Sequence, residues 1–174
     1  MNWSERVSPL VRSIPPSGIR RFFDIVAEMS GVISLGVGEP DFVTPWHIRE
    51  SCVHGLQRGY TSYTSNYGLL ELRQEICKMM ENDYGVSYNP KGEALVTVGV
   101  SEALDLAMRT ILSPGDEVLV PEPCYVSYNA CVTLAGGKPV SVCCTRENEF
   151  RVTVPQLEDA VTPRTKALLI GYPN

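Results

Sequence analysis

Residues 117–144 read EVLVPEPCYVSYNACVTLAGGKPVSVCC, and they contain two strand-like segments on either side of a helix-like one. The apolar run at 117–120 is typical of a buried strand, residues 125–134 have a helix-like pattern, and residues 139–144 are strand-like again. Strands that alternate with helices along a chain pair in parallel and are joined by right-handed crossovers. The stretch therefore predicts a parallel β-α-β unit.

The same alternation continues on both sides of this unit. Thr153-Val154-Pro155-Gln156 matches a capping box with proline in the first turn, which predicts a short helix before a last strand. The other predicted elements are helices at 18–29, 46–56, 69–84 (closed by Gly85), 101–112 and 157–161, and strands at 94–100 and 167–170. We expect an α/β fold: a mainly parallel sheet with helices on both faces.

Composition limits the class of protein. The 174 residues are 44% hydrophobic and 20% charged, with a formal net charge of -5, which is typical of a mildly acidic globular protein. No basic stripe is present to neutralise phosphates, so nucleic acid is not an expected partner. The N-terminus lacks the features of a secretory signal, and no segment is long enough to span a bilayer. We therefore expect a cytoplasmic protein without membrane contact.

The cysteines and histidines do not indicate a metal site. Six cysteines lie mostly in apolar segments and none forms a CxxC pair, so we interpret them as reduced core residues. His47 and His54 are seven residues apart on a predicted helix, but two histidines without a third ligand make a poor metal site.

Residues 97–107, TVGVSEALDLA, contain a candidate anion site. The predicted strand turns at Gly99 and passes into a helix at Ser101, which would aim backbone N–H groups and the positive end of the helix dipole at a ligand. An ordinary strand-to-helix turn with Ser101 as N-cap would have the same sequence. Neither a P-loop nor a GxGxxG motif is present.

Residues 121–128, PEPCYVSY, contain a candidate aromatic contact. Pro121 and Pro123 are expected to end the preceding strand, which sets Tyr125 at the head of the next helix, near the strand ends. Its ring could stack on a flat cofactor, or it could simply be half-buried packing.

A series of ordered motifs resembles the class I/II aminotransferases, enzymes of pyridoxal phosphate fold type I. The motifs are LGVGEPDFVTP (35–45), YTSNYGLLELR (63–73), TVGVSEAL (97–104), SPGDEVLVPEPCYVSY (113–128), AGGKPV (135–140) and the closing YPN. The resemblance covers almost the whole chain. It implies residues 1–45 as an N-terminal arm and part of a small domain, and residues 46–174 as the first part of a large domain that binds pyridoxal 5′-phosphate.

The resemblance also implies roles for five residues. Val100 and Ser101 are similar to the phosphate-binding turn, and Tyr125 to the aromatic residue that stacks on the pyridine ring. Tyr63 resembles the tyrosine that reaches the phosphate of the neighbouring subunit, which implies a homodimer. Gly38 resembles the backbone position that approaches the substrate carboxylate. The expected substrates are an L-amino acid and a 2-oxo acid.

The last residues, KALLIGYPN (166–174), form a strand and a turn that the family continues into NPTG, so we expect the sequence to be the N-terminal part of an enzyme. By the resemblance, the aspartate, Schiff-base lysine and carboxylate-binding arginine would follow later. The four lysines here, Lys78, Lys91, Lys138 and Lys166, match no such motif, so we expect the chain alone to be inactive, with an unpaired edge on its last strand.

Two alternatives stay open at this point. One is a non-catalytic binding or assembly module that keeps the anion site of the fold. The other is a different enzyme of the same fold type, a C–S lyase or a cyclising synthase, because the first half of such chains separates these chemistries poorly. Within the aminotransferases, the sequence leaves aspartate, alanine and aromatic amino acids as substrates.

Overall fold

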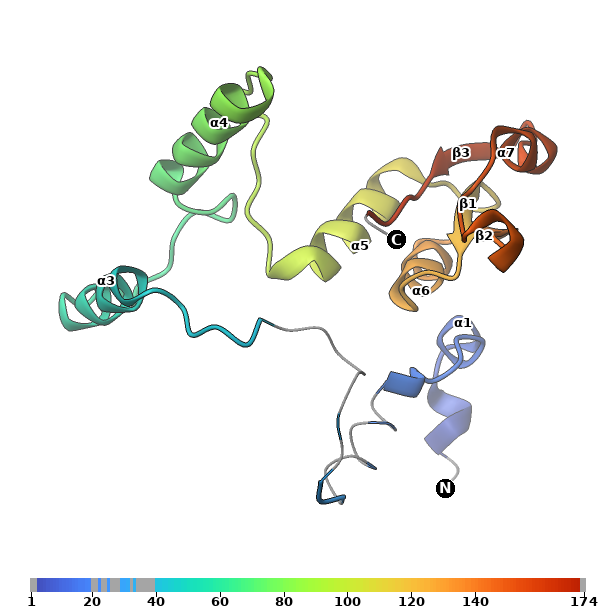
Figure 1. The fold of residues 1–174 in the computed structure, drawn as a ribbon, viewed down its shortest axis with the longest axis horizontal. Helices are drawn as coiled ribbons and strands as arrows, with labels where there is room; N and C mark the ends of the chain where they lie inside the picture. Colours follow the sequence, from blue (N-terminus) through green and yellow to red (C-terminus); the bar gives the residue numbers. More distant parts are fainter. Residues whose placement is uncertain are drawn as a thin grey trace. The chain divides into compact units, whose positions relative to one another are not determined.

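The computed structural model describes residues 3–19, 22, 25, 29–31, 33 and 40–172. The chain divides into two compact units, which we call the sheet unit (Met1–Ser17 with Val98–Asn174) and the helical unit (Gly18–Thr97). Figure 1 shows the elements of each. The predicted domain boundary after residue 45 follows the family layout rather than this division, and it stays a prediction. Most of the predicted helix at 18–29 lies outside the described residues.

The sheet unit is built on three parallel strands in the order β2-β1-β3. Strand β1 (Glu117–Glu122) lies in the middle, with β2 (Lys138–Cys143) on one side and β3 (Thr165–Leu168) on the other. The predicted parallel sheet is confirmed. Within the described residues β3 pairs with β1 alone, so it is an edge strand, as expected, although it begins and ends two residues earlier than predicted.

Strand β1 runs further than its prolines suggested. Pro121 pairs with Val142 of β2, and the N–H of Cys144 donates to the carbonyl oxygen of Glu122 at 2.8 Å. Proline removes one donor from a ladder, but here β2 supplies donors beyond that position. The prediction that Pro121 ends the strand was therefore wrong by two residues.

The core of the sheet unit lies between β1 and two helices, α5 (Gly99–Ile111) and α6 (Ser127–Leu134). Val118 and Val120 project to the same face of β1, and both side chains are fully buried. The buried cluster that contains them also includes Met108, Leu112, Val132 and Leu169. Leu119, on the opposite face, is 2% exposed, which explains why β1 is a continuous apolar run.

Shorter elements complete the sheet unit. They are η1 (Trp3–Arg6), α1 (Pro9–Arg12), η2 (Arg146–Asn148) and α7 (Val154–Ala160). The predicted capping box at the start of α7 is confirmed: the N–H of Thr153 donates to Oε1 of Gln156 at 3.0 Å. Nε2 of Gln156 also donates to the carbonyl oxygen of Cys143 at 2.7 Å, which ties the start of α7 to the end of β2.

The helical unit contains α3 (Trp46–Gln57) and α4 (Leu70–Tyr84), both close to their predicted bounds. Helix α4 ends at Gly85, whose φ of 68° is the left-handed conformation expected of a terminating glycine. Among the described residues, no helix is long and apolar enough to cross a membrane.

The predicted strand at 94–100 does not form. Residues 94–98 are not in a strand, and α5 begins at Gly99, two residues before the predicted helix start. The N–H of Val96 donates to the carbonyl oxygen of Tyr67 at 3.1 Å, so this bond joins the segment to the loop before α4 and not to a strand. A strand needs a neighbouring strand, and no described strand pairs with this one.

The interpretation of the cysteines holds only in part. Cys77 and Cys144 are buried, and Cys124 and Cys131 are partly buried. Cys52 and Cys143 are exposed, so the prediction of a core position was wrong for these two. All six are free thiols.

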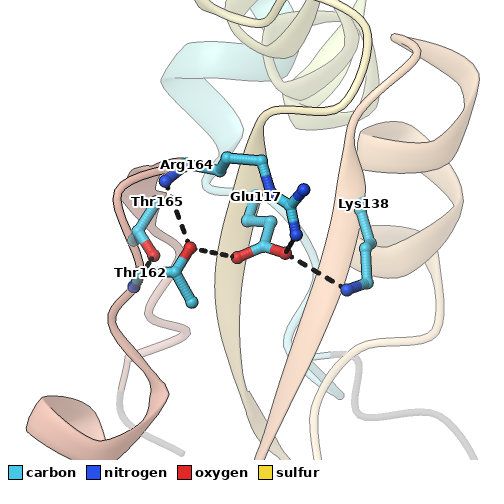
Figure 2. Close-up of polar contacts among 5 residues, drawn as sticks. All are labelled: Glu117, Lys138, Thr162, Arg164 and Thr165. Atoms are coloured by element: carbon cyan, nitrogen blue, oxygen red, sulfur yellow. Dashed lines mark hydrogen bonds and ion pairs between the residues drawn. The ribbon is translucent and has the colours of Figure 1, made fainter.

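Glu117, at the amino end of β1, is a buried carboxylate that joins β1 to the start of β2 and to the turn before β3. Its side chain is 3% exposed and accepts hydrogen bonds from Oγ1 of Thr162 (2.6 Å), Nζ of Lys138 (3.1 Å) and Nη2 of Arg164 (3.4 Å), as Figure 2 shows. The bond from Thr162, and then the bond from Lys138, lower the pKa of Glu117 below its ordinary value, while desolvation opposes them.

Candidate functional site

The carboxyl ends of the three strands open into a hollow of about 900 Å³, which we call the carboxyl-edge hollow. This is the edge at which open α/β sheets bind their ligands. Its wall contains residues that end or follow each strand: Pro121 from β1, Cys144 after β2, and Ile170 after β3. The remaining wall residues are Pro123, Cys124, Tyr125, Glu149, Phe150, Arg151, Val152 and Gly171.

Tyr125 lies on the wall of this hollow, as the sequence predicted for a residue near the strand ends. The residue is 46% exposed, so part of the ring remains available to a ligand. The other part contacts Tyr128 of α6, with ring centroids 5.7 Å apart and planes at 83°, an edge-to-face arrangement. The ring of Tyr125 is thus supported by protein on one side and open on another.

Cys124, next to Tyr125, is not arranged as a nucleophile. Burial raises the pKa of its thiol, and the charge of Glu122 raises it further. The thiol therefore stays protonated at neutral pH, and its sulfur lies 3.6 Å from the carbonyl oxygen of Tyr125. Its contribution to the hollow is packing.

Helix α5 begins with the turn that was predicted to bind an anion. Gly99 has a φ of 76°, and the N–H of Val98 before it donates to the carboxylate of Glu102. Val100 and Ser101 are exposed, and no described residue outside the helix accepts a hydrogen bond from their N–H groups. A helix start with open N–H groups is an anion-binding geometry, although the carboxylate of Glu102 already uses one donor.

The structure places the predicted site residues unevenly. Val100, Ser101 and Tyr125 belong to the sheet unit, but only Tyr125 is among the described residues that line the hollow. Tyr63 lies in the helical unit and is fully exposed. Gly38 lies outside the described residues. The roles of these residues stay predictions.

None of the four lysines, all of which lie in the described part of the chain, lines the hollow. Lys138 is bonded to Glu117 at the amino end of the sheet, and Lys166 is the second residue of β3, so both are distant from the carboxyl ends along their strands. Lys78 forms an exposed pair with Glu75, and Lys91 is exposed in a turn. Within the described ranges, no group of three or more His, Cys, Asp or Glu side chains could hold a metal ion.

Several residues on the wall, and Tyr128 next to it, were not predicted as site residues from the sequence. Glu149 and Phe150 both have a positive φ, 53° and 58°, which is rare for residues other than glycine. Their residue types do not indicate this backbone conformation. Tyr128 carried one signal, its spacing of three from Tyr125 at a helix start, which brings two side chains together. Gly171 lies in the turn GYPN at residues 171–174, but its closeness to Tyr128 depends on the tertiary fold.

A parallel sheet with a ligand-sized hollow at its carboxyl edge, an aromatic ring on the wall and an open helix start defines an α/β protein of the ligand-binding kind. Residues 30–174 match the family described as aminotransferase class I and II. The chain therefore belongs to this family.

Individual relatives agree with this assignment. The chain is 55% identical to the putative aminotransferase YugH of Bacillus subtilis over 168 residues, which are 97% of this chain and 44% of that protein. It is 44% identical to aromatic-amino-acid aminotransferase 2 of Thermococcus litoralis, covering 97% of this chain and 43% of the relative. The chain thus spans less than half the length of these curated relatives.

Solved structures give the same result for the fold. The aspartate aminotransferase of Thermus thermophilus with maleate superposes with a TM-score of 0.88 at 36% identity, covering 97% of this chain and 45% of that one. The aspartate aminotransferase of Rhizobium meliloti gives a TM-score of 0.87 at 37% identity, with 97% and 43% covered. The α/β fold expected from the sequence is confirmed.

Proposed function

We propose that the protein carrying this chain is a pyridoxal 5′-phosphate-dependent aminotransferase, which moves an amino group between an L-amino acid and a 2-oxo acid. One observation carries the proposal: in this chain, which belongs to the family, the half-exposed ring of Tyr125 lies on the wall of the carboxyl-edge hollow. We further propose that the protein is cytoplasmic and acts as a homodimer.

The residues present fit the cofactor. A flat aromatic ring suits a pyridine ring, and the open N–H groups of Val100 and Ser101 suit a phosphate. We assign the phosphate to these two residues and to Tyr63 from a second subunit, the pyridine ring to Tyr125, and the approach to the substrate carboxylate to Gly38. Bound pyridoxal 5′-phosphate supplies the electron-withdrawing ring that weakens bonds at the amino-acid Cα.

We propose the class of amino-acid substrate from the names of the relatives. Aspartate and aromatic names both occur among the similar proteins, which supports aspartate or an aromatic amino acid as the substrate. We keep alanine as the third substrate that the sequence resemblance left open. The relatives described above are named aminotransferases, which favours amino transfer over a non-catalytic module, a lyase or a cyclising synthase.

The decisive experiment uses the complete protein. We expect it to take up pyridoxal 5′-phosphate with a visible absorption band, and we expect single amino acids, offered one at a time, to convert that band while releasing the matching 2-oxo acid. A protein that shows no cofactor band would contradict the proposal. A protein that binds cofactor but converts a sulfur-containing amino acid to pyruvate, ammonia and a thiol or sulfide, instead of the matching 2-oxo acid, would indicate lyase chemistry.

A further inference from the structure

The ring of Tyr125 does not stand alone. Tyr128 contacts it edge to face, and the N–H of Tyr128 donates to the carbonyl oxygen of Tyr125 at 3.0 Å. Tyr128 itself is partly buried and packs against the core cluster that includes Val120, Val132 and Leu169. The ring that supports Tyr125 is therefore fixed to the most buried part of the sheet unit.

Gly171, after β3, leaves the space that Tyr128 occupies. A Cβ at this position would lie 3.0 Å from the hydroxyl oxygen of Tyr128 and 3.3 Å from its Cε2. Both distances are shorter than ordinary van der Waals contact, so the ring would have to shift. Since Gly171 and Tyr125 also line the same hollow, any shift of Tyr128 acts on the wall of the site.

We propose that Tyr128 is a positioning residue that holds the ring of Tyr125 toward the cofactor, and that Gly171 is required because it admits the Tyr128 ring. This inference rests on the proposed function for its cofactor, but the contact itself is independent of it. Core packing holds the ring of Tyr128 in place, and Tyr128 in turn contacts the ring of Tyr125.

The first test measures cofactor affinity by titration, together with the induced circular dichroism of the bound cofactor, which reports the orientation of its ring. Tyr128→Leu removes the supporting ring, and we expect binding about three- to tenfold weaker, the worth of an edge-to-face pair. Tyr128→Phe keeps the ring, and we expect affinity and dichroism within about twofold of the parent. Tyr84→Leu, which removes an exposed tyrosine from α4, serves as the control and should change neither.

A double-mutant cycle separates positioning from general destabilisation. If Tyr128 acts through Tyr125, then Tyr128→Leu has little further effect once Tyr125→Leu is present. Gly171→Ala should weaken binding like Tyr128→Leu, and combining it with Tyr128→Phe should recover part of the loss, because the hydroxyl at 3.0 Å is gone. Additive losses from Tyr125→Leu and Tyr128→Leu, or an unchanged spectrum in Tyr128→Leu, would overturn the inference.

A second readout does not need the cofactor. In protein labelled with 3-fluorotyrosine, we expect the fluorine resonance of Tyr125, assigned by its loss in Tyr125→Leu, to move in Tyr128→Leu and in Gly171→Ala. Protein without cofactor binding but with moved resonances would refute the proposed function and keep the ring contact. Unmoved resonances would refute the positioning role, whatever the cofactor does.

Discussion

At the scale of single residues, Gly99 is a glycine that is required for its backbone conformation and not for lack of space. Its φ of 76° lies in the left-handed region. Apart from its chain neighbours and the backbone of its own helix, no atom of the described residues lies within 4 Å of the place where a Cβ would be. Gly92 has equally open surroundings but no left-handed φ. Because neither position is crowded, comparing alanine substitutions at Gly99 and Gly92 measures backbone strain alone.

We expect Gly99→Ala to lower the free energy of unfolding by about 1–2 kcal/mol, the cost of a left-handed residue with a side chain. Gly92→Ala should be neutral or slightly stabilising, because it restricts only the unfolded chain. Urea unfolding of both variants measures the difference. If Gly99 sets the direction of the N–H groups of Val100 and Ser101, Gly99→Ala also weakens cofactor binding. Equal stability of the two variants would show that the turn is not strained.

The ionised side chain of Glu117 stabilises the folded sheet in a way that depends on pH. Its pKa is lowered, so its ionised form favours the folded state, and this stabilisation is present above its ordinary pKa of about 4.5. As the pH falls through the lowered pKa, the carboxylate takes up a proton in the folded state too, and the stabilisation is lost. The hydrogen bond from Thr162 lowers the pKa of Glu117 most, and the hydrogen bond from Lys138 lowers it next. The positive charges of Lys138 and Arg164 act in the same direction.

We therefore expect Glu117→Gln to unfold at a lower urea concentration than the parent at pH 7, and the two midpoints to converge as the pH falls below about 4.5. The matched control is Glu75→Gln, whose exposed pair with Lys78 at 3.7 Å should matter little at any pH. A gap between parent and Glu117→Gln that stays constant down to pH 3 would contradict the role of ionisation.

At the scale of elements, Arg73 fixes the start of α4 to the chain that follows the helix. The residue is 6% exposed, and its Nη1 donates to the carbonyl oxygen of Pro90 at 2.6 Å. Its guanidinium also lies 5.8 Å from the centroid of the Tyr67 ring, a cation–π distance. Its Nε is buried and has no partner among the described residues.

Arg73→Ala should lower the free energy of unfolding by about 2–3 kcal/mol, because a charge-assisted hydrogen bond and the packing of the stem are lost together. Arg73→Lys keeps the charge but not the planar group, so an intermediate loss is expected. Arg109→Ala, which breaks a solvent-accessible pair with Asp105 on α5, should change the free energy of unfolding little. Similar losses for Arg73→Ala and Arg109→Ala in urea unfolding would show that burial adds nothing here.

Elements with a clear local pattern could be predicted from the sequence. The three strands of the sheet and helices α3, α4 and α6 lie within a few residues of their expected bounds, because apolar spacing and terminating residues are local signals. The strand at 94–100 was wrong because strand formation needs a partner, which the segment itself does not encode. The Glu117 cluster could not be found either, since Thr162 and Arg164 are 45 and 47 residues away along the chain.

The candidate site divides in the same way. Tyr125 could be selected because the turn after a strand places its ring at a known edge of the sheet. Its support by Tyr128 and Gly171 joins the segments after β1 and β3, and such a contact exists only once the strands are paired. The family resemblance supplied roles, whereas the fold supplies the contacts that make a role physically reasonable.

At the scale of the whole molecule, the proposed dimer makes a prediction about Tyr63. The residue is fully exposed, and apolar ring surface in contact with water is unfavourable in free energy unless another protein surface covers it. If Tyr63 completes the phosphate site of the neighbouring subunit, each site contains Ser101 from one chain and Tyr63 from the other. A two-fold dimer then has two such mixed sites.

This arrangement can be tested by mixing two defective variants. Ser101→Asp places a carboxylate where the phosphate would bind, and Tyr63→Phe removes the hydroxyl, so each variant alone should bind the cofactor poorly. In a hybrid dimer, one site combines the intact Ser101 with the intact Tyr63, while the other site carries both defects. After random exchange of subunits, half of the dimers are hybrids, so about one quarter of all sites should regain parental affinity. Cofactor titration and transfer of amino groups would both report this fraction. If Tyr63 instead serves its own subunit, every site in every dimer keeps one defect, and mixing restores nothing.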